Sequence, residues 1–171
     1  MLGKSGVNSK NIYYETPKKG SFGDSDYSLS SLKKEFNLTL DPCAPIEAKQ
    51  DPKRACCKHY FTEEEDGLKQ EWPENSFVNP PFNDIANWIK KGIVQSQKRG
   101  TTNVYLLPAY VGTPWWHDYV LLYGVIRYIR GRLKYWRDGG PVSGSPNIDS
   151  VIVIFEAPNP KSYPWNKEDD D

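Results

Sequence analysis

The chain has 171 residues, and its 22 lysines and arginines balance 22 aspartates and glutamates. This length suits about one domain with a single core, and the cancelled charge excludes a general attraction to nucleic acid or acidic membranes. Mean hydropathy is −0.71 and apolar runs such as 151–155 are far shorter than the roughly 20 residues of a bilayer span, so a transmembrane protein is excluded. The three cysteines cannot all pair and the N-terminus lacks an apolar signal segment, so we expect a cytoplasmic protein without a disulfide framework.

The two ends of the chain differ in composition from the middle. Residues 1–23 are polar and show no apolar periodicity, which predicts a flexible N-terminal arm. Residues 158–171 contain prolines and end in an acidic run, which predicts a disordered tail. The folded domain is therefore expected at residues 24–157.

Helical and strand patterns alternate within the expected domain. Apolar residues at spacings of three and four predict one helix from Leu29 to Asn37 and a clearer one from Ile85 to Gly100. Short apolar runs bounded by turn residues predict strands at 38–40, 58–61, 77–78, 104–107, 125–129 and 151–155. This alternation predicts an α/β fold with a mostly parallel sheet and flanking helices.

The sharpest motif is Asn-Pro-Pro-Phe at 79–82, directly after the strand expected at 77–78. Pro81 restricts Pro80 to an extended conformation, so the Pro80 carbonyl is held beside the amide oxygen of Asn79. An exocyclic amine offers two N–H donors, and two fixed acceptors draw a ring-conjugated amine toward the tetrahedral geometry in which it attacks. Phe82 adds a face on which the ring stacks. The loop therefore predicts methylation of a ring amine.

This loop matches the (Asp/Asn/Ser)-Pro-Pro-(Tyr/Phe/Trp) signature of amino-methyltransferases. Over roughly residues 24–157 the chain resembles the small phage-type DNA N6-adenine methyltransferases, and its segments keep that family's order. The segments that carry the resemblance are 40–44, 60–68, Trp72, 79–82, Trp88, 106–109, 116–119 and 129–134. The resemblance implies a Rossmann-like class I fold, S-adenosylmethionine as cofactor and DNA as partner. It also implies that Asn79, Pro80 and Phe82 hold a flipped adenine, with Pro81 in the same catalytic loop.

The resemblance further implies cofactor contacts. Asp41 ends the first strand of the expected sheet, at the edge where ligands of such sheets bind. It is therefore the expected partner of the cofactor's ammonium group. The structural alternative is that Asp41, which precedes Pro42, only caps the turn. Among the acidic residues after the second strand, Asp66 is the first candidate, as the family's contact with the cofactor's adenine amine, and Glu63 is the second. A Thr-Pro pair precedes the first motif in this family, but here it lies further upstream than usual. The remaining candidate contacts are Cys43, Ala44, Thr16 and Pro17.

A cluster of cations with interleaved aromatic residues is the candidate DNA-binding surface. Backbone phosphates require such a cluster when the net charge is zero, and aromatic side chains stack on or wedge between bases. The alternative is an edge hairpin whose charges only prevent aggregation. The loop at 139–146 is expected to be flexible and could order on the duplex. The cations are Arg127, Arg130, Arg132, Lys134 and Arg137.

No metal is expected, because the three cysteines and His59 lack the C-x₂-C spacing of structural zinc sites. The resemblance implies transfer of a methyl group from S-adenosylmethionine to N6 of adenine in DNA. We expect such an enzyme in the cytoplasm, that of the host if it is phage-encoded, without a membrane or an obligate protein partner. Two alternatives remain open. Cytosine N4 is also a ring-conjugated amine, and the absence of glycine from residues 41–46 leaves room for a catalytically idle nucleic-acid-binding module.

Overall fold

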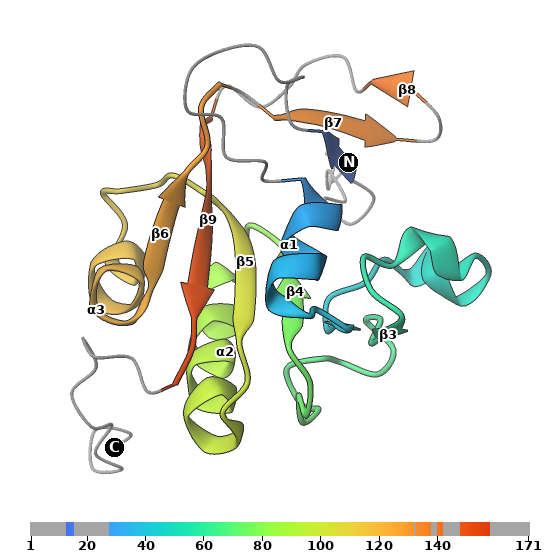
Figure 1. The fold of residues 1–171 in the computed structure, drawn as a ribbon, viewed down its shortest axis with the longest axis horizontal. Helices are drawn as coiled ribbons and strands as arrows, with labels where there is room; N and C mark the ends of the chain where they lie inside the picture. The colour runs from blue at the N-terminus through green and yellow to red at the C-terminus, as the bar shows by residue number, and fades with distance from the viewer. Residues whose placement is uncertain (1–12, 16–27, 132, 138–139, 142–147, 158–171) are drawn as a thin grey trace, which may run out of the picture.

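The computed structural model describes residues 13–15, 28–131, 133–137, 140–141 and 148–157. Its centre is a six-stranded sheet in the order β3-β2-β4-β5-β9-β6 (Figure 1). The strands are β2 (Leu40–Asp41), β3 (His59–Tyr60), β4 (Ser76–Val78), β5 (Asn103–Pro108), β6 (Val125–Tyr128) and β9 (Ser150–Phe155). Each strand coincides with a segment where the sequence predicted one, to within a few residues.

The sheet is mixed, which corrects the expectation of a mostly parallel sheet. β3, β2, β4 and β5 pair in parallel, whereas β9 is antiparallel both to β5 and to β6. A continuous apolar run reports that a strand is buried on both faces, but it carries no information on the direction of the strand. The α/β class itself is confirmed.

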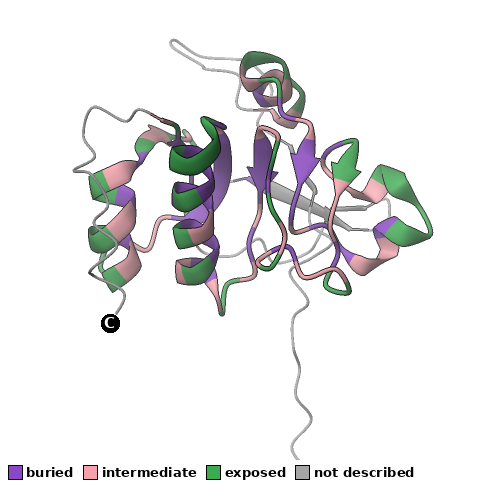
Figure 2. Ribbon diagram, turned by 90° about the horizontal axis from the view of Figure 1, so that it is seen from below, coloured by how far each residue is buried: buried purple, intermediate pink, exposed green. Residues whose placement is uncertain are grey.

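Helices cover both faces of the sheet (Figure 1). On one face, Leu32 of α1 (Leu29–Phe36) is buried in a cluster with Phe77 of β4. On the other face, Trp88 and Ile89 of α2 (Ile85–Arg99) are buried in a second cluster that includes Tyr105. Successive residues of β5 and β9 alternate between the two clusters, as the pleat of a strand requires. Figure 2 shows the result: buried strands between helices whose outer sides are exposed.

Both long helices end where their capping residues require. Ser28 begins α1, and its hydroxyl accepts a hydrogen bond from the Ser31 N–H at 3.2 Å. Asn37 ends α1 with φ of 50°, and Gly100 ends α2 with φ of 69°, so both residues adopt the left-handed conformation common after helices. These caps explain why the sequence located the helix ends correctly.

Shorter elements complete the described structure. Two 3₁₀-helices, η2 (Ile46–Lys49) and η3 (Pro52–Arg54), follow β2. A π-helical turn, η4 (Trp116–Val120), leads into α3 (Leu121–Tyr123) and buries Trp116 in the cluster of α2. None of the helices in the described ranges has the length and apolar character of a membrane span.

A second, three-stranded sheet has the order β1-β7-β8, with antiparallel pairs. Its strands are β1 (Tyr13–Glu15), β7 (Lys134–Arg137) and β8 (Gly140–Pro141). In Figure 1 this small sheet lies above the main sheet, next to the edge where β6 ends and β9 begins. β1 is a strand that the prediction of a flexible arm at 1–23 did not include. The rest of that arm and the tail at 158–171 lie outside the described residues.

Gly92 allows α2 to approach β5 closely. A Cβ atom on Gly92 would lie 2.1 Å from the hydroxyl oxygen of Tyr105, whose side chain is fully buried and donates to the Trp88 carbonyl at 2.6 Å. Because Tyr105 cannot move aside, we expect Gly92→Ala to lower the free energy of unfolding by about 1–3 kcal/mol in urea denaturation. A Cβ atom on Gly112 would meet nothing within 4 Å, so Gly112→Ala should change this free energy by less than about 0.5 kcal/mol. Equal stability of the two variants would contradict the prediction.

Candidate active site

The loop at 79–82 leaves the sheet at the edge where the parallel strands β2, β4 and β5 end. Leu40 lies opposite Ser76, and Val78 lies opposite Tyr105, so this register places three chain segments side by side. They are the turn after Asp41, the loop after Val78, and the residues after Pro108. Ligands of open α/β sheets bind at such carboxyl ends.

Two acceptors of the 79–82 loop are uncommitted. Asn79 is half-buried, and within the described part of the chain its side-chain amide makes no hydrogen bond. The Pro80 carbonyl likewise accepts no backbone hydrogen bond from a described residue. The next carbonyl, that of Pro81, accepts from the Asp84 N–H at 3.1 Å and so fixes the loop to the start of α2. The rigid loop thus presents two oxygen acceptors to which no described residue donates a hydrogen bond.

The aromatic residue of the loop lies near the surface. The Phe82 side chain is 45% exposed, and its ring meets that of Tyr110 edge to face, with 6.5 Å between centroids and 76° between planes. Tyr110 follows β5 and is half-buried. The contact holds one edge of Phe82 in place and leaves ring surface for a ligand.

Asp41 is a buried carboxylate that closes its own turn. It is 3% exposed, its Oδ1 accepts from the Cys43 N–H at 3.1 Å, and its Oδ2 accepts from the Cys56 N–H at 2.8 Å. Burial raises the pKa of Asp41 to about 6, and the hydrogen bonds from Cys56 and Cys43 limit the rise. The structural alternative, capping of the turn before Pro42, is confirmed by the Cys43 contact. The predicted contact with a cofactor is compatible with it, because each carboxylate oxygen has a second lone pair.

The loop that contains Asp66 packs directly on the Asp41 turn. A Cβ atom on Gly67 would lie 1.9 Å from the Pro42 carbonyl oxygen and 3.1 Å from the ring of Trp88, so only glycine fits here. The Gly67 carbonyl accepts from the indole N–H of Trp72 at 2.9 Å, and the two tryptophan rings stack at 6.1 Å between centroids. Trp88 is therefore a core residue, as its place on the apolar stripe of α2 predicted.

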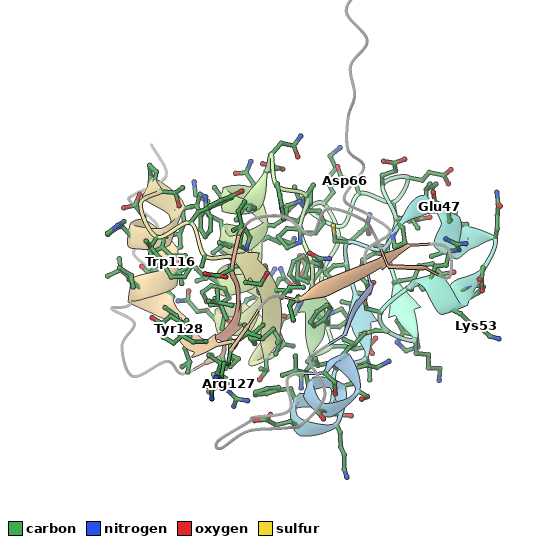
Figure 3. All side chains as sticks on the ribbon, turned by 90° about the horizontal axis from the view of Figure 1, so that it is seen from above. Glu47, Lys53, Asp66, Trp116, Arg127 and Tyr128 are labelled. Atoms are coloured by element: carbon green, nitrogen blue, oxygen red, sulfur yellow. The ribbon has the colours of Figure 1, made fainter. Side chains whose placement is uncertain are left out.

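The acidic residues after β3 differ in their contacts. Asp66 has φ of 53°, and its carboxylate accepts from the Leu68 N–H at 3.3 Å and pairs with Lys69 at 3.0 Å. The ammonium of Lys69 holds the pKa of Asp66 below its usual value. Glu63, the second candidate, is exposed. Asp66, labelled in Figure 3, thus lies in the loop that packs on the Asp41 turn, and its carboxylate accepts a hydrogen bond within its own turn.

Glu65 is held at the surface by contacts with Thr62 and Lys49. Its Oε2 accepts from the Thr62 N–H at 2.8 Å and from the Thr62 hydroxyl at 2.6 Å, and its Oε1 lies 2.5 Å from the Lys49 ammonium. Hydrogen bonds from Lys49 and Thr62 lower the pKa of Glu65 to about 2. These contacts fix the segment after β3, so Glu65 is not part of a freely solvated face.

The comparison with families of known proteins agrees with this geometry. Residues 25–165 match the model of the family DNA N-6-adenine-methyltransferase (Dam). The chain belongs to this family. It is accordingly an adenine-specific DNA methyltransferase, which acts on DNA and methylates N6 of adenine. The match supports neither cytosine N4 as the target nor an idle binding module, and a search of curated proteins found no match.

Two more of the methyltransferase's predicted cofactor contacts lie beside Asp41. Cys43 is half-buried and packs against the core cluster of α2, and Ala44 is buried with its N–H donating to the Phe61 carbonyl at 2.9 Å. The structure therefore brings Asp41, Cys43 and Ala44 together at one corner of the sheet. Thr16 and Pro17 lie outside the described residues.

The predicted DNA-binding cations of the methyltransferase are spread over two sheets. Arg127 on β6 forms a two-pronged ion pair with Glu35 of α1, at 2.8 and 2.6 Å, and lies 5.0 Å from the centre of the Phe36 ring. Arg130 is exposed after the end of β6. Arg132 lies outside the described residues, as does most of the loop at 139–146, and of Lys134 and Arg137 only the backbone, in β7, is described.

β6, which carries Arg127, is the edge strand of the main sheet, and β7 lies between β1 and β8 in the small sheet, so the alternative of an edge hairpin whose charges prevent aggregation stays open beside DNA binding. Figure 3 shows Arg127 and Tyr128 at the opposite end of the sheet from Glu47 and Lys53. Tyr128, next to Arg127 on β6, is 71% exposed.

The cysteines of the methyltransferase are free thiols. Cys43, Cys56 and Cys57 form no disulfide, and the residues described here contain no group of three histidine, cysteine or acidic side chains that could hold a metal.

Sequence reasoning missed two residues of the site. Cys56 contacts Asp41 from the segment before β3, and Tyr110 supports Phe82 from the segment after β5. No pattern in the sequence links Cys56 to Asp41, because the bond uses a backbone N–H that any residue except proline provides. For Tyr110 a signal existed, since it follows the strand end at Pro108, where site residues of this fold class gather.

Proposed function

We propose that the methyltransferase takes its methyl group from S-adenosylmethionine in a Rossmann-like class I site at the carboxyl edge of β2 and β4. We propose further that Asn79, Pro80 and Phe82 hold the target adenine in this site. The observation that carries the proposal is the pair of unused acceptors on the rigid loop after β4, beside a partly exposed aromatic ring. Because the Asn79 amide is only half-buried and has no hydrogen-bond partner among the described residues, it is accessible to the N–H groups of a ligand.

The residues around Asp41 fit the cofactor. Its carboxylate accepts the Cys43 N–H, the Cys56 N–H and a hydrogen bond from the Cys56 thiol, so it retains acceptor capacity for the ammonium group of the cofactor's methionine part. Because the pKa of Asp41 is about 6, the carboxylate is mostly ionised at neutral pH. Half-buried apolar side chains offer a lining for the cofactor's base near the same edge: Phe61, Leu68 and Ala109.

The chain's contribution to methyl transfer is mainly positioning. S-adenosylmethionine, when bound, supplies an electrophilic methyl group. The Asn79 amide oxygen and the Pro80 carbonyl accept the two N–H groups of the adenine amine and direct its lone pair away from the ring, while Phe82 stacks on the base. No general base is needed in the attack, because the amine loses its extra proton afterward. Effective molarities of about 10⁵ M or more for well-aligned groups show how much of the barrier positioning removes.

DNA is proposed to lie across the same edge. An adenine in a duplex must be extruded before its amine reaches the loop at 79–82. β6 is parallel to β5 and ends at the same edge of the sheet, so Tyr128 and Arg130 emerge on the side where the base would enter. We propose Arg127, Arg130, Arg132, Lys134 and Arg137 as the cations that bind the backbone phosphates.

Product analysis tests the proposed function. The enzyme is incubated with methyl-labelled S-adenosylmethionine and a mixed-sequence duplex, and the DNA is digested to nucleosides. We expect the label in N6-methyl-2′-deoxyadenosine, and none in a control duplex that contains only guanine and cytosine. Label found solely in N4-methyl-2′-deoxycytidine would contradict the assignment, and an absence of any heat or thermal shift on addition of the cofactor would contradict the choice of methyl donor.

A further inference from the structure

A chain of hydrogen bonds connects α1 to the buried carboxylate at the end of β2. The Lys33 ammonium donates to the Cys56 carbonyl at 2.9 Å, and the N–H of the same residue donates to Asp41 Oδ2 at 2.8 Å. Lys33 is half-buried in the last turn of α1, and the segment around Cys56 is held between this helix and β2. The Lys33 ammonium therefore binds, through its carbonyl, the same residue whose N–H supports Asp41.

Hydrogen bonds from Cys56 and Cys43 are the main compensation for the buried charge of Asp41, and Lys33 adds a smaller contribution through its positive charge. The ionisable groups that face Asp41 are Lys33 from α1, Cys43 from the turn after β2, and Cys56 and Cys57 from the segment before β3. Burial raises the pKa of both Cys56 and Cys57, so these thiols stay neutral at physiological pH. Lys33 is thus the one positive charge among the described groups that favours the ionised form of Asp41.

We propose that Lys33 is a positioning residue for methyl transfer: its ammonium, bound to the Cys56 carbonyl, keeps the Asp41 carboxylate in place and negatively charged for the cofactor's ammonium group. This inference rests on the proposed function, because it assumes that Asp41 contacts the cofactor. Lys33 itself lies on the far side of Cys56 from Asp41 in this chain of bonds and acts through it.

The pH dependence of cofactor binding tests the role of Lys33. We expect Lys33→Met to move the midpoint of the affinity profile to higher pH, because it removes a positive charge that favours the ionised form of Asp41. With the parental midpoint near the Asp41 pKa of about 6, the affinity for S-adenosylmethionine should fall more at pH 6 than at pH 8, and a shift of about one pH unit would make the loss about fivefold at pH 6 and less than about twofold at pH 8. Calorimetric titration across pH 5–8 measures both values, and Lys33→Gln replaces Lys33→Met if the latter does not fold.

The controls use the same helix. Lys34→Met removes an exposed lysine next along α1 and should keep the parental profile, and Lys33→Arg should also keep it because it retains a cation and a donor. An unchanged midpoint in Lys33→Met, or an equal loss of affinity at pH 6 and pH 8, overturns the proposal. Asp41→Asn separates the two inferences. If this variant binds S-adenosylmethionine as tightly as the parent does, the cofactor role of Asp41 is overturned. If Asp41→Asn binds the cofactor weakly while Lys33→Met keeps the parental pH profile, only the role of Lys33 is overturned.

Discussion

Replacing Asn79 by alanine should reduce methyl transfer at least about a hundredfold while cofactor affinity stays within about twofold. The amide oxygen is one of the two acceptors on the loop after β4 that the fold leaves unused. Its loss removes an acceptor aimed at the adenine amine and leaves the corner around Asp41 untouched. Single-turnover methylation of a duplex with labelled cofactor measures the first effect, and calorimetric titration measures the second.

Asn83 provides the matched control for this experiment. It is an exposed asparagine one residue beyond the Asn-Pro-Pro-Phe loop. Asn83→Ala therefore changes the same chemical group without touching the proposed adenine contacts, and its methylation rate should stay within about twofold of the parent. Parental turnover in Asn79→Ala would show that another group orients the amine.

Cofactor affinity should depend on pH through Asp41. Only the ionised carboxylate attracts the cofactor's ammonium, which remains charged below its own pKa of about 8. Burial raises the pKa of Asp41 to about 6, so the ionised fraction, and with it the affinity, should rise about tenfold between pH 5 and pH 7. Asp41→Asn should weaken binding about ten- to a hundredfold at pH 7.5 and abolish this dependence, because a charge-assisted hydrogen bond contributes about 1.5–3 kcal/mol.

The control for Asp41→Asn is the same substitution at Asp51, an aspartate that is not among the proposed cofactor contacts. Asp51 is exposed and caps η3 by accepting from the Lys53 N–H at 3.2 Å. Asp51→Asn retains an acceptor for this N–H, so both affinity and its pH dependence should match those of the parent. A pH-independent parental affinity between pH 5 and pH 7 would show that Asp41 carries no charge toward the cofactor.

The local features of this fold were predictable because they depend on near neighbours in sequence. The spacing of Ile85, Trp88, Ile89 and Ile93 defined the buried stripe of α2, and Gly100 defined its end. The loop at 79–82 was predictable for the same reason, since two prolines restrict their own backbone and that of the residue before them. Asp41 was located correctly at the end of a parallel strand.

Features that depend on distant segments were not predictable. β9 is antiparallel to both of its neighbours, β5 and β6. The apolar sequence of a strand does not indicate whether the strand pairs in parallel or antiparallel. The ion pair between Arg127 and Glu35 joins residues far apart in the chain, and no periodicity connects them. The same holds for the contact between Gly67 and Pro42, where a close approach of two backbones decides the residue type.

The position of β9 has a consequence for synthesis of the protein. This strand inserts between β5 and β6 and contributes residues to both core clusters, although it is the last strand in the described chain. While a ribosome is still extending the chain short of residue 150, one backbone edge of β5 and one of β6 lack their pairing strand, and both core clusters lack the apolar side chains that β9 contributes. We therefore infer that most of the cooperative folding takes place late, after the final strand has been translated.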